Sequence, residues 1–590
     1  MRPRSNSLAL HLFAYLAFLL LSFCGATAAQ AQQIQVTAAT PSSAAQGTVN
    51  LNVKVTGKGF KNGASARFFV TATTDTGGVT VNSTTFVSST ELTANITVSD
   101  TAALANFDVQ VLAADGRGGK GTELFAVVAK SAASAGTCTN LALSPDEGTS
   151  PVAASSTFVS PSTVSETCAA NPALPGCLDA SFGGAGLVAT TVSPGNWAVG
   201  VVVQPDGKSV VAVRGTNPSG TGSDFYAARY DAAGYLDPSF GGAGAVRLQF
   251  TSCADAEHVR AIALLPDGKI LLAGYAYIKS STYGFAVARL NADGSLDTSF
   301  GTGGRAFFGF TQSTILQAMA LQSDGRIVLA GNAGDNDFSV ARLTAGGQLD
   351  GTFGSGGKVV VQTAKSGSGG QATAVAVQRV NSEERIVVGG TSPASGSLSR
   401  DFAVIRFTPA GALDASFGSG GKVFTDFSGY ADRANAVIIA GEGIILGGVA
   451  GADSTNTVNH FGLVKYRLNG QLDTTFGVGG KVTTDIPYSA NLSVFAMAVQ
   501  ADGKIIAGGE SRYTTTGPGD FILARYHPNG SPDVTFGPTG NGQVVTDYAL
   551  VDRGPNGIVL QADGKILVAG AFCLTNPGSF EYVGLVRYMP

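Results

Sequence analysis

Basic residues and aspartates recur at a fixed spacing in the C-terminal two thirds of the chain, and they are the most regular pattern of reactive side chains. In the segment RLNADGSLDTSFG, Arg289 stands eight residues before Asp297. A strand that ends at the arginine and returns after the NADG turn would place the two charges opposite each other. We therefore expect an ion pair at each copy, which is a structural role. The expected pairs are Arg229 and Asp237, Arg289 and Asp297, Arg342 and Asp350, Arg406 and Asp414, Lys465 and Asp473, and Arg525 and Asp533.

A seventh pair would join the two ends of the repeated region. Asp179 belongs to the same kind of segment but has no arginine eight residues before it, and Arg587 has no such segment after it. We expect these two residues to be partners. The first segment and the strand GLVATTV would then complete a unit whose other strands come from residues 556–588.

Residues for catalysis, metal binding or cofactor binding are scarce. The histidines His258, His460 and His527 form no HExxH pair, and no GxSxG motif or fixed pair of acids is present. The repeated GxGG leads into a strand, unlike a dinucleotide-binding loop, which opens a helix. The aspartates of segments such as NADGSLD are not retained in copies such as TAGGQLD, which argues against a repeated calcium loop. We expect no cofactor, no metal and no nameable catalytic residue, and an enzyme is the less favoured reading.

Cysteine spacing indicates one disulfide. Cys168 and Cys177 are close in sequence, and an exported compartment permits disulfides. Cys138, Cys253 and Cys573 have no CxxC spacing typical of zinc or redox sites, and their connectivity stays open.

The first residues predict export. Two arginines precede an apolar run from Leu8 to Phe23, and Ala29-Gln30-Ala31 has the pattern of a signal-peptidase site. We expect residues 1–31 to be a signal peptide and the product to be extracellular, on the cell surface or periplasmic. Lipidation at Cys24 is the weaker alternative, because Phe23 stands where a small residue is usual. No later segment has the length and apolarity of a transmembrane helix.

The composition predicts a folded protein made of short strands. The chain has 590 residues, 80 glycines, 44% hydrophobic residues and only 13% charged residues. A disordered chain would have fewer apolar residues and more net charge than -4. A near-neutral charge without basic runs also argues against nucleic acid as a partner.

Seven copies of the box LDxxFG indicate a repeat architecture. They begin at residues 178, 236, 296, 349, 413, 472 and 532, and each unit contains four strand-like runs. The first two runs are joined by a tight turn such as PDG, which predicts antiparallel hairpins. Four antiparallel strands in each of seven units fit a seven-bladed β-propeller over residues 178–590, closed by its N-terminal strand. We expect the box phenylalanines, such as Phe300 and Phe476, to pack between blades.

Two family resemblances follow from these motifs. The LDxxFG boxes and PDG hairpins resemble the delta-60 repeat, found in secreted bacterial propellers of unknown function. Residues 32–130 contain alternating runs such as VNLNVKV and FDVQVLA, which predict a small β-sandwich. The segment TPSSAAQGTVNLNVKVTGKGF resembles the immunoglobulin-like IPT/TIG family, which implies a spacer or contact module. The intervening residues 131–177, rich in Ser, Ala, Thr and Pro, are expected to be a linker.

Two sets of loops of variable length should share one face of the propeller, and binding residues often lie on such loops. We expect this face to bind an extracellular protein or glycan without catalysis. The alternative is a hydrolase or lyase acting on a carbohydrate or lactone in the central channel; the oligomeric state is open. The candidate binding residues are Trp197, His258, Arg260, Tyr277, Tyr283, Tyr430, Asp432, Arg433, Tyr488, Arg512, Tyr513 and Arg553.

Overall fold

The computed structural model divides into two compact units, residues 1–134 and residues 135–590, and each is described by itself. The expected signal peptide lies outside the described residues. Within the described part of the chain, no helix has the length and apolarity needed to cross a membrane. The structure describes residues 33–590 except 47, 49–50, 100, 129–149, 158–167, 169, 194, 219, 221, 252–255, 280–281, 335–336, 364–369, 394–399, 456, 487–490, 513–518, 547–550 and 574–581.

The first unit contains two four-stranded sheets around one hydrophobic core. Alternate residues of its strands are buried, as expected where one face of a sheet packs inward. Phe68 and Phe125 meet edge to face in this core, with ring centroids 5.2 Å apart. In spatial order, one sheet is β1 (Gln35–Thr40), β3 (Leu51–Lys58), β6 (Glu91–Val98) and β5 (Val79–Ser88), and the other is β2 (Ser43–Ala45), β8 (Gly118–Val128), β7 (Asn106–Leu112) and β4 (Ser65–Val70).

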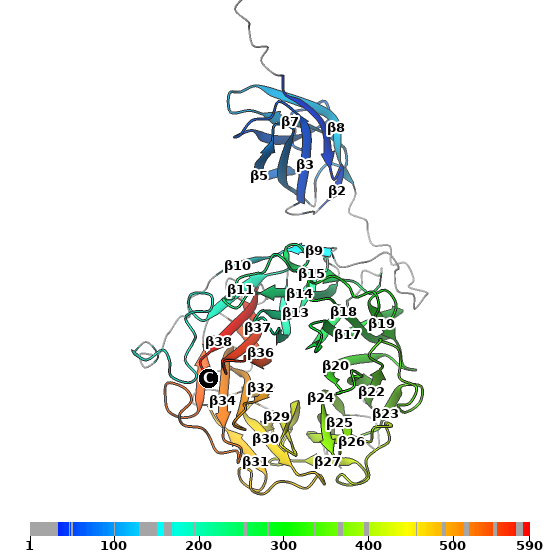
Figure 1. The fold of residues 1–590 in the computed structure, drawn as a ribbon, viewed down its shortest axis with the longest axis vertical. Coiled ribbons are helices and arrows are strands. Elements are labelled where there is room, and N and C mark those ends of the chain that lie inside the picture. The colour runs from blue at the N-terminus through cyan, green and yellow to red at the C-terminus, as the bar shows by residue number, and fades with distance from the viewer. Residues whose placement is uncertain are drawn as a thin grey trace, which may run out of the picture. The chain divides into compact units, whose positions relative to one another are not determined.

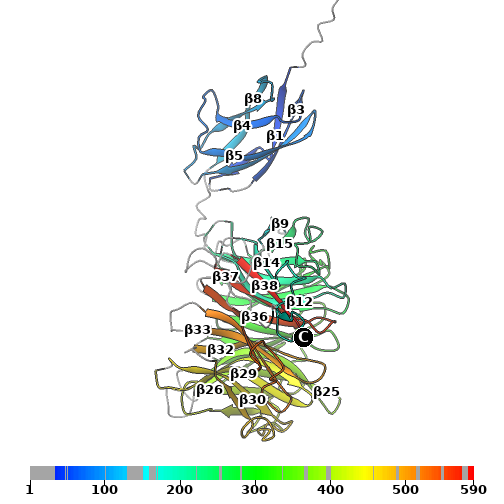
Figure 2. The same ribbon diagram turned by 90° about the vertical axis from the view of Figure 1, so that its left-hand side faces the viewer.

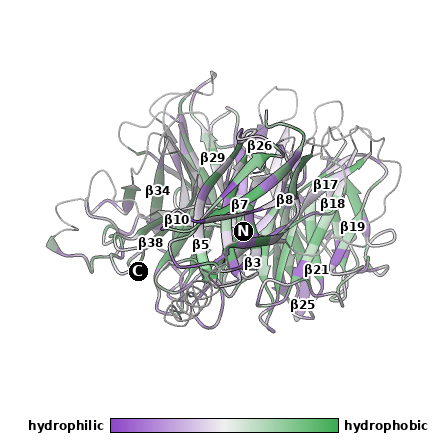
Figure 3. Ribbon diagram, turned by 90° about the horizontal axis from the view of Figure 1, so that it is seen from above, coloured by the Kyte–Doolittle hydropathy of each residue, from purple (hydrophilic) through white to green (hydrophobic). Residues whose placement is uncertain are grey.

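The second unit is a ring of seven four-stranded antiparallel sheets, which confirms the all-β propeller expected from the seven repeats (Figure 1). Viewed from above and coloured by hydropathy, the propeller strands are mostly hydrophobic (Figure 3). Small apolar residues of the first strand of every blade line the central channel. From the innermost strand outward, the blades are β12 (Trp197–Val203), β13 (Ser209–Thr216), β14 (Ser223–Tyr230), β15 (Gly244–Leu248); β16 (His258–Leu264), β17 (Ile270–Lys279), β18 (Thr282–Leu290), β19 (Arg305–Phe308); β20 (Thr314–Leu321), β21 (Ile327–Ala333), β22 (Asp337–Leu343), β23 (Lys358–Val361); β24 (Gln371–Val380), β25 (Glu383–Pro393), β26 (Arg400–Phe407), β27 (Lys422–Thr425); β28 (Arg433–Ala440), β29 (Gly443–Gly451), β30 (Asn459–Tyr466), β31 (Lys481–Thr484); β32 (Asn491–Val499), β33 (Ile505–Arg512), β34 (Gly519–Tyr526), β35 (Gln543–Thr546); and β36 (Val551–Leu560), β37 (Ile566–Cys573), β38 (Tyr582–Tyr588), β11 (Leu187–Thr191).

The first two strands of each blade are joined by tight hairpins. In most blades the glycine of the PDG-like turn has positive φ, for example 84° at Gly207. In blade 4 the departing sequence VNSEER forms a two-residue turn, in which Asn381 and Ser382 take φ of 48° and 70°. Positive φ at both central residues is typical of a type I′ turn. The hairpin therefore persists although its PDG sequence does not.

The last blade contains both ends of the propeller sequence. The outer strand β11 pairs antiparallel with β38, the last strand of the chain, with Ala189 opposite Gly584. In Figure 1 the teal strand β11 lies beside the red strand β38, and Figure 2 shows β37 and β38 from the side, near β14 and β15 of blade 1. Backbone hydrogen bonds between the two ends of the propeller thus hold this blade together.

The expected linker over residues 131–177 requires a correction. Within it, β9 (Ser150–Ala153) pairs with β15 of blade 1, and β10 (Ser155–Thr157) pairs with β11 of blade 7. Outer strands carry unpaired N–H and C=O groups, so even a short segment can add to them. Only one residue separates β9 from β10, and we call residues 150–157 the strap, because they join the first blade to the last.

Candidate functional site

The hairpin face of the propeller, which carries the first hairpins and the LDxxFG boxes, holds the repeated charges. The structure brings together the members of all seven pairs named from the sequence. In the six arginine pairs, Nε lies 2.7–3.0 Å from the aspartate, and Lys465 Nζ lies 3.4 Å from Asp473. Arg406 is typical, because its side chain is only 1% exposed and lies 2.9 Å from Asp414.

These arginines also connect neighbouring blades. Nη1 of Arg406 donates to the carbonyl of Leu468 in the next blade at 2.6 Å, and Nη2 donates to Ser416 of its own box at 3.1 Å. Its guanidinium lies 4.5 Å from the ring centroid of Phe417, within the range of a cation–π contact. The guanidinium is thus fully used by structural contacts.

A second cation reaches most of the box aspartates from the first hairpin. Lys565 Nζ lies 3.0 Å from Asp179, which also accepts from Arg587 at 2.7 Å. Burial raises the pKa of Asp179, but hydrogen bonds from Ser181 and Lys565 and the charge of Arg587 together lower it to about 2. An acid with this pKa is ionised at neutral pH and is unsuited to proton transfer there.

The phenylalanine of each box is buried between blades. All seven are at most 1% exposed. A Cβ added to Gly294, in the turn of the second blade, would meet the ring of Phe240 of the first blade at 3.0 Å, so this turn packs directly on the ring. These rings serve packing and leave no surface for a ligand.

In most blades, the box glycine donates a hydrogen bond to a turn of the next blade. In blade 7, residues that precede the first box provide this acceptor instead. In the first blade, Gly241 N donates to Asp293 O, in the turn of the next blade, at 2.8 Å. In the sixth blade, the corresponding Gly537 N donates to Pro175 O at 2.9 Å. Pro175 lies inside the loop closed by the Cys168–Cys177 disulfide.

The opposite face, which we call the loop face, carries the longer loops and the first residues of the innermost strands. Each innermost strand has a β-bulge near this end. Bulges redirect side chains and are common next to functional sites. At the bulges, the channel of about 260 Å³ is lined by Val199, Arg260, Gln317, Thr373, Asn435, Phe495 and Asn556.

Three of these bulge residues bind the next blade. Asn435 Nδ2 donates to Val494 O at 2.8 Å, and Thr373 Oγ1 donates to Ala434 O at the same distance. Asn556 of the last blade donates to Ala198 O of the first at 2.9 Å. Three of the side chains that line the channel thus also hold neighbouring blades together.

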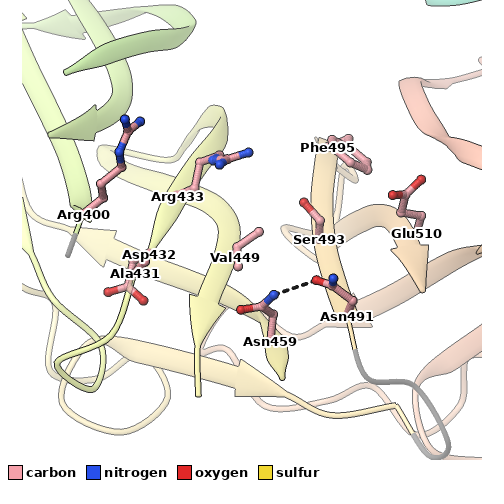
Figure 4. A pocket seen from close by; sticks show the side chains of 10 residues that line it. All are labelled: Arg400, Ala431, Asp432, Arg433, Val449, Asn459, Asn491, Ser493, Phe495 and Glu510. Carbon is pink, nitrogen blue, oxygen red and sulfur yellow. Dashed lines mark hydrogen bonds between the residues drawn. The ribbon is translucent and has the colours of Figure 1, made fainter. Parts of the chain in front are cut away.

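A polar hollow of about 640 Å³ opens on the loop face between blades 4, 5 and 6. In Figure 4, Arg400 and Arg433 extend toward its open side, while Phe495 and Glu510 stand on the neighbouring blade. Asn459 Nδ2 donates to Asn491 Oδ1 at 2.6 Å on the floor of the hollow. The hollow is lined by Arg400, Ala431, Asp432, Arg433, Val449, Asn459, Asn491, Ser493, Phe495 and Glu510.

The carboxylates near this hollow are occupied by the backbone. Asp432 accepts from Phe427 N at 2.7 Å and from Gly451 N at 2.9 Å, and Glu510 accepts from Gly554 N at 3.1 Å. Burial, with the charges of two neighbouring aspartates, raises the pKa of Asp432 to about 7 although its hydrogen bonds lower it.

Those neighbours are Asp401 and Asp426. Ligand oxygens of the three aspartates lie within 4.8 Å of one another, the single acidic grouping of this kind in the described part of the chain. This grouping has no sequence signature, because Asp401 lies on β26 and the other two aspartates lie in the loop before β28.

A second cluster on the loop face lies between blades 1 and 2. Arg214 Nη1 lies 3.1 Å from His258 Nδ1, and the imidazole stacks on Tyr275 at 4.8 Å. Arg260 lies 5.6 Å from the ring centroid of Tyr275. Burial and the charges of the two arginines lower the pKa of His258 to about 4, so this histidine is neutral at pH 7.

The structure groups some of the candidate binding residues and separates others. Trp197, His258, Arg260, Tyr277 and Tyr283 lie in the cluster between blades 1 and 2. Tyr430 lies in the loop before β28, and Asp432 and Arg433, which follow it, line the hollow. Asp432 supports that loop and is buried. Tyr488 and Tyr513 lie outside the described residues, as do the side chains of Arg512 and Arg553.

Sequence reasoning missed several residues of both sites. Arg214 and Arg400 belong to strands and not to loops, and Asn491 and Phe495 lie on an innermost strand. The signal available was their departure from the repeat, because Phe495 stands at the bulge position that Asn435 occupies in the preceding blade.

Several solved structures are similar to the chain at low sequence identity. No curated protein matches the chain. The β-propeller domain of the Trilobed protease from Pyrococcus furiosus is 9% identical, with a TM-score of 0.34, covering 68% of this chain and 94% of that chain. The GH93 α-L-arabinofuranosidase of Fusarium graminearum is 10% identical (TM-score 0.35; 56% and 92% covered), and the NanB sialidase from Streptococcus pneumoniae is also 10% identical (TM-score 0.33; 68% and 69% covered).

A family model matches each blade. The model is described as "Domain of unknown function (DUF5122) beta-propeller", and its seven matches cover residues 204–240, 265–300, 322–353, 385–417, 444–476, 500–536 and 561–590. Each match runs from a first hairpin into an LDxxFG box or, for the last, to the end of the chain. These seven matches support β-propeller repeats in this part of the chain.

Proposed function

We propose that this protein is an exported, noncatalytic binding protein whose loop face holds a glycan. The observation that carries the proposal is the hollow of about 640 Å³, which combines two arginines, amide and hydroxyl side chains and the half-buried ring of Phe495. Sites for small ligands commonly combine an apolar surface with a few oriented polar groups. Because Asp432 and Glu510 already accept backbone hydrogen bonds, the hollow is better suited to binding than to hydrolysis.

The test is a glycan array probed with the purified full chain. We expect selective binding of a group of related glycans, which Phe495→Ala weakens by about tenfold or more, the loss of one well-packed contact. Val545→Ala is the matched control, because Val545 is 48% exposed on an outer strand away from the hollow. Turnover of a carbohydrate or lactone in a hydrolase and lyase panel would instead favour the enzyme alternative.

We further propose that the first unit is an immunoglobulin-like spacer of the IPT/TIG type and that the chain is exported. Its two-sheet core and the apolar run before Ala31 support these roles. In a secreting host, mass spectrometry of the purified product should find a mature N-terminus near Gln32. An intact Met1 in an otherwise folded product would contradict export through this signal.

A further inference from the structure

Two pairs of arginines lie toward the loop face, on different blades; of the four, Arg260 lines the channel and Arg400 and Arg433 line the hollow. The first pair is Arg214 on β13 and Arg260 on β16, in blades 1 and 2, and the second pair is Arg400 on β26 and Arg433 on β28, in blades 4 and 5. Blade 3 separates the pairs on one side of the ring, and blades 6 and 7 separate them on the other (Figure 1). The two pairs therefore lie on opposite sides of the ring.

Neither pair forms an ion pair with a described carboxylate, although Asp432 and Glu510 line the same hollow as Arg400 and Arg433. Among the described residues, no ion pair to an acid is recorded for any of the four arginines, whereas every box arginine has one. Burial and then the charge of Arg260 lower the pKa of Arg214, and burial and then the charge of Arg400 lower that of Arg433. Arg214 and Arg260 contact the stacked rings of His258 and Tyr275, and Arg400 and Arg433 line one hollow. Like charges gathered in this way repel each other, and an anion bound between them would relieve the repulsion.

Each pair adjoins groups that suit a sugar ring. Arg214 lies 5.4 Å from the ring centroid of Trp197, and Phe495 shares the hollow with Arg433. Aromatic rings offer apolar faces to the C–H groups of a sugar, while Asn491 and Ser493 offer donors and acceptors to its hydroxyls. Guanidinium groups bind carboxylate and sulfate oxygens through paired, charge-assisted hydrogen bonds.

We propose that the ligand of the loop face is an acidic polysaccharide whose carboxylate or sulfate groups bind both arginine pairs, so that the polymer lies across the channel mouth. This inference rests on the proposed function, glycan binding at the loop face, and adds the charge and the length of the glycan. A single-stranded nucleic acid is another polyanion that could reach both arginine pairs, and its binding is one of the outcomes of the test below.

The ligand class can be tested without any variant. Calorimetric titration of the full chain would compare polygalacturonate with its fully methyl-esterified form, and dextran sulfate with dextran. Each comparison keeps the backbone and removes the charge, and the two together separate carboxylate from sulfate. We expect at least one charged polymer to bind about tenfold or more tightly than its neutral counterpart, since charge-assisted hydrogen bonds are lost with the charge. A single-stranded oligonucleotide serves as the competing polyanion.

The spanning geometry is tested with paired variants. Arg214→Gln with Arg260→Gln should weaken binding of the charged polymer about tenfold, and so should Arg400→Gln with Arg433→Gln. Arg379→Gln with Arg467→Gln is the matched control, because both residues are exposed near the hairpin face, and it should leave binding unchanged. Thermal unfolding checks each variant, and Arg→Lys versions, which keep the charge, replace any that fail to fold.

The outcomes separate this inference from the proposed function. If neutral and charged glycans bind equally, the acidic ligand is wrong and glycan binding stands. If only one pair matters, the polymer does not span the channel. Tighter binding of the oligonucleotide would replace the ligand class, and binding of no glycan at all would overturn the proposed function as well.

Discussion

The two faces of the propeller use the same residue types in opposite ways. On the hairpin face, Arg406 contacts Asp414, a phenylalanine ring and a carbonyl of the next blade. On the loop face, Arg260 and Arg433 have no acidic partner among the described residues, and each lies near another arginine. Charge that is repeated in every blade stabilises the ring. These two arginines of the loop face, which are not repeated in every blade, lack such a partner in the described part of the chain.

The largest loss of stability is expected for the Arg587–Asp179 pair, which joins the two ends of the propeller sequence. Arg587→Ala removes one of the two cations that contact Asp179, which is 7% exposed, together with the bonds of Arg587 to Ala232 and Ser181. We expect a loss of about 3–5 kcal/mol in the free energy of unfolding. Chemical denaturation of Arg587→Ala, Asp179→Ala and the double variant measures it. A double variant no less stable than either single one would show the coupling, and strictly additive losses would refute it.

The pH dependence on the alkaline side sharpens the comparison. Burial raises the pKa of Glu257, on the loop face, to about 8, against the hydrogen bonds from Phe250 and Thr251. A folded-state pKa above the unfolded value near 4.5 means that the folded state binds more protons between these values. Stability should therefore fall as pH rises from about 4.5 to about 8, by at most about 1.4 kcal/mol per pH unit. Thermal melts of Glu257→Gln should show a flatter profile in this window; an unchanged slope would exclude the assignment.

At acid pH, stability should fall as the pH is lowered, because the box aspartates of the hairpin face become protonated. The pKa values of Asp179, Asp237 and Asp350 are lowered to about 2, from a usual value near 3.8. A depressed folded-state pKa stabilises above the unfolded value, and this stability is lost as pH falls from about 4 to about 2. Acid titration followed by near-ultraviolet circular dichroism should show unfolding in this window. At neutral pH, Asp350→Asn should be less stable than the unsubstituted protein, and it should lose less stability as the pH falls. If the two stability curves run parallel, ionisation of Asp350 does not cause the acid unfolding.

The smallest effect concerns charges of the hairpin face that water already reaches. Arg326 and Asp324 lie 2.7 Å apart, but their side chains are 38% and 42% exposed. Asp324→Ala should cost about 0–1 kcal/mol, because exposed ion pairs gain little over their hydration. Denaturant midpoints of this variant and of Arg342→Ala, whose side chain is 1% exposed, make the contrast. Equal losses of stability in the two variants would mean that burial does not determine how much these ion pairs contribute to the free energy of unfolding.

The hairpin face could be predicted largely from sequence, because its contacts recur in every blade. Arg289 and Asp297 are eight residues apart, and the turn between these residues brings them together. Because this spacing recurs along the chain, it predicts the same ion pair in each blade. The seven hairpins followed in the same way, even where VNSEER replaced PDG. Each of these features depends on residues near one another in sequence.

The loop face could be predicted only in outline. The sequence predicts that the variable loops share one face of the ring. The hollow on that face combines residues of different blades, such as Arg400 and Phe495, which no local sequence pattern relates. The bulges that direct Arg260 and Asn435 into the channel have no residue signature. The strap was missed because strands of four and three residues in a Ser- and Ala-rich segment resemble a linker.

The strap also gives the propeller a mechanical order. A pull transmitted along the chain from its amino-terminal side loads residues 150–157 before it loads the closing strand β11, because they come first in sequence. Those residues hydrogen-bond to the first blade and to the last, so the load is shared between the two sides of the junction. A force applied to the chain before residue 150 would therefore act first on the strap. Blades 1 and 7 would stay together until the strap separated from them.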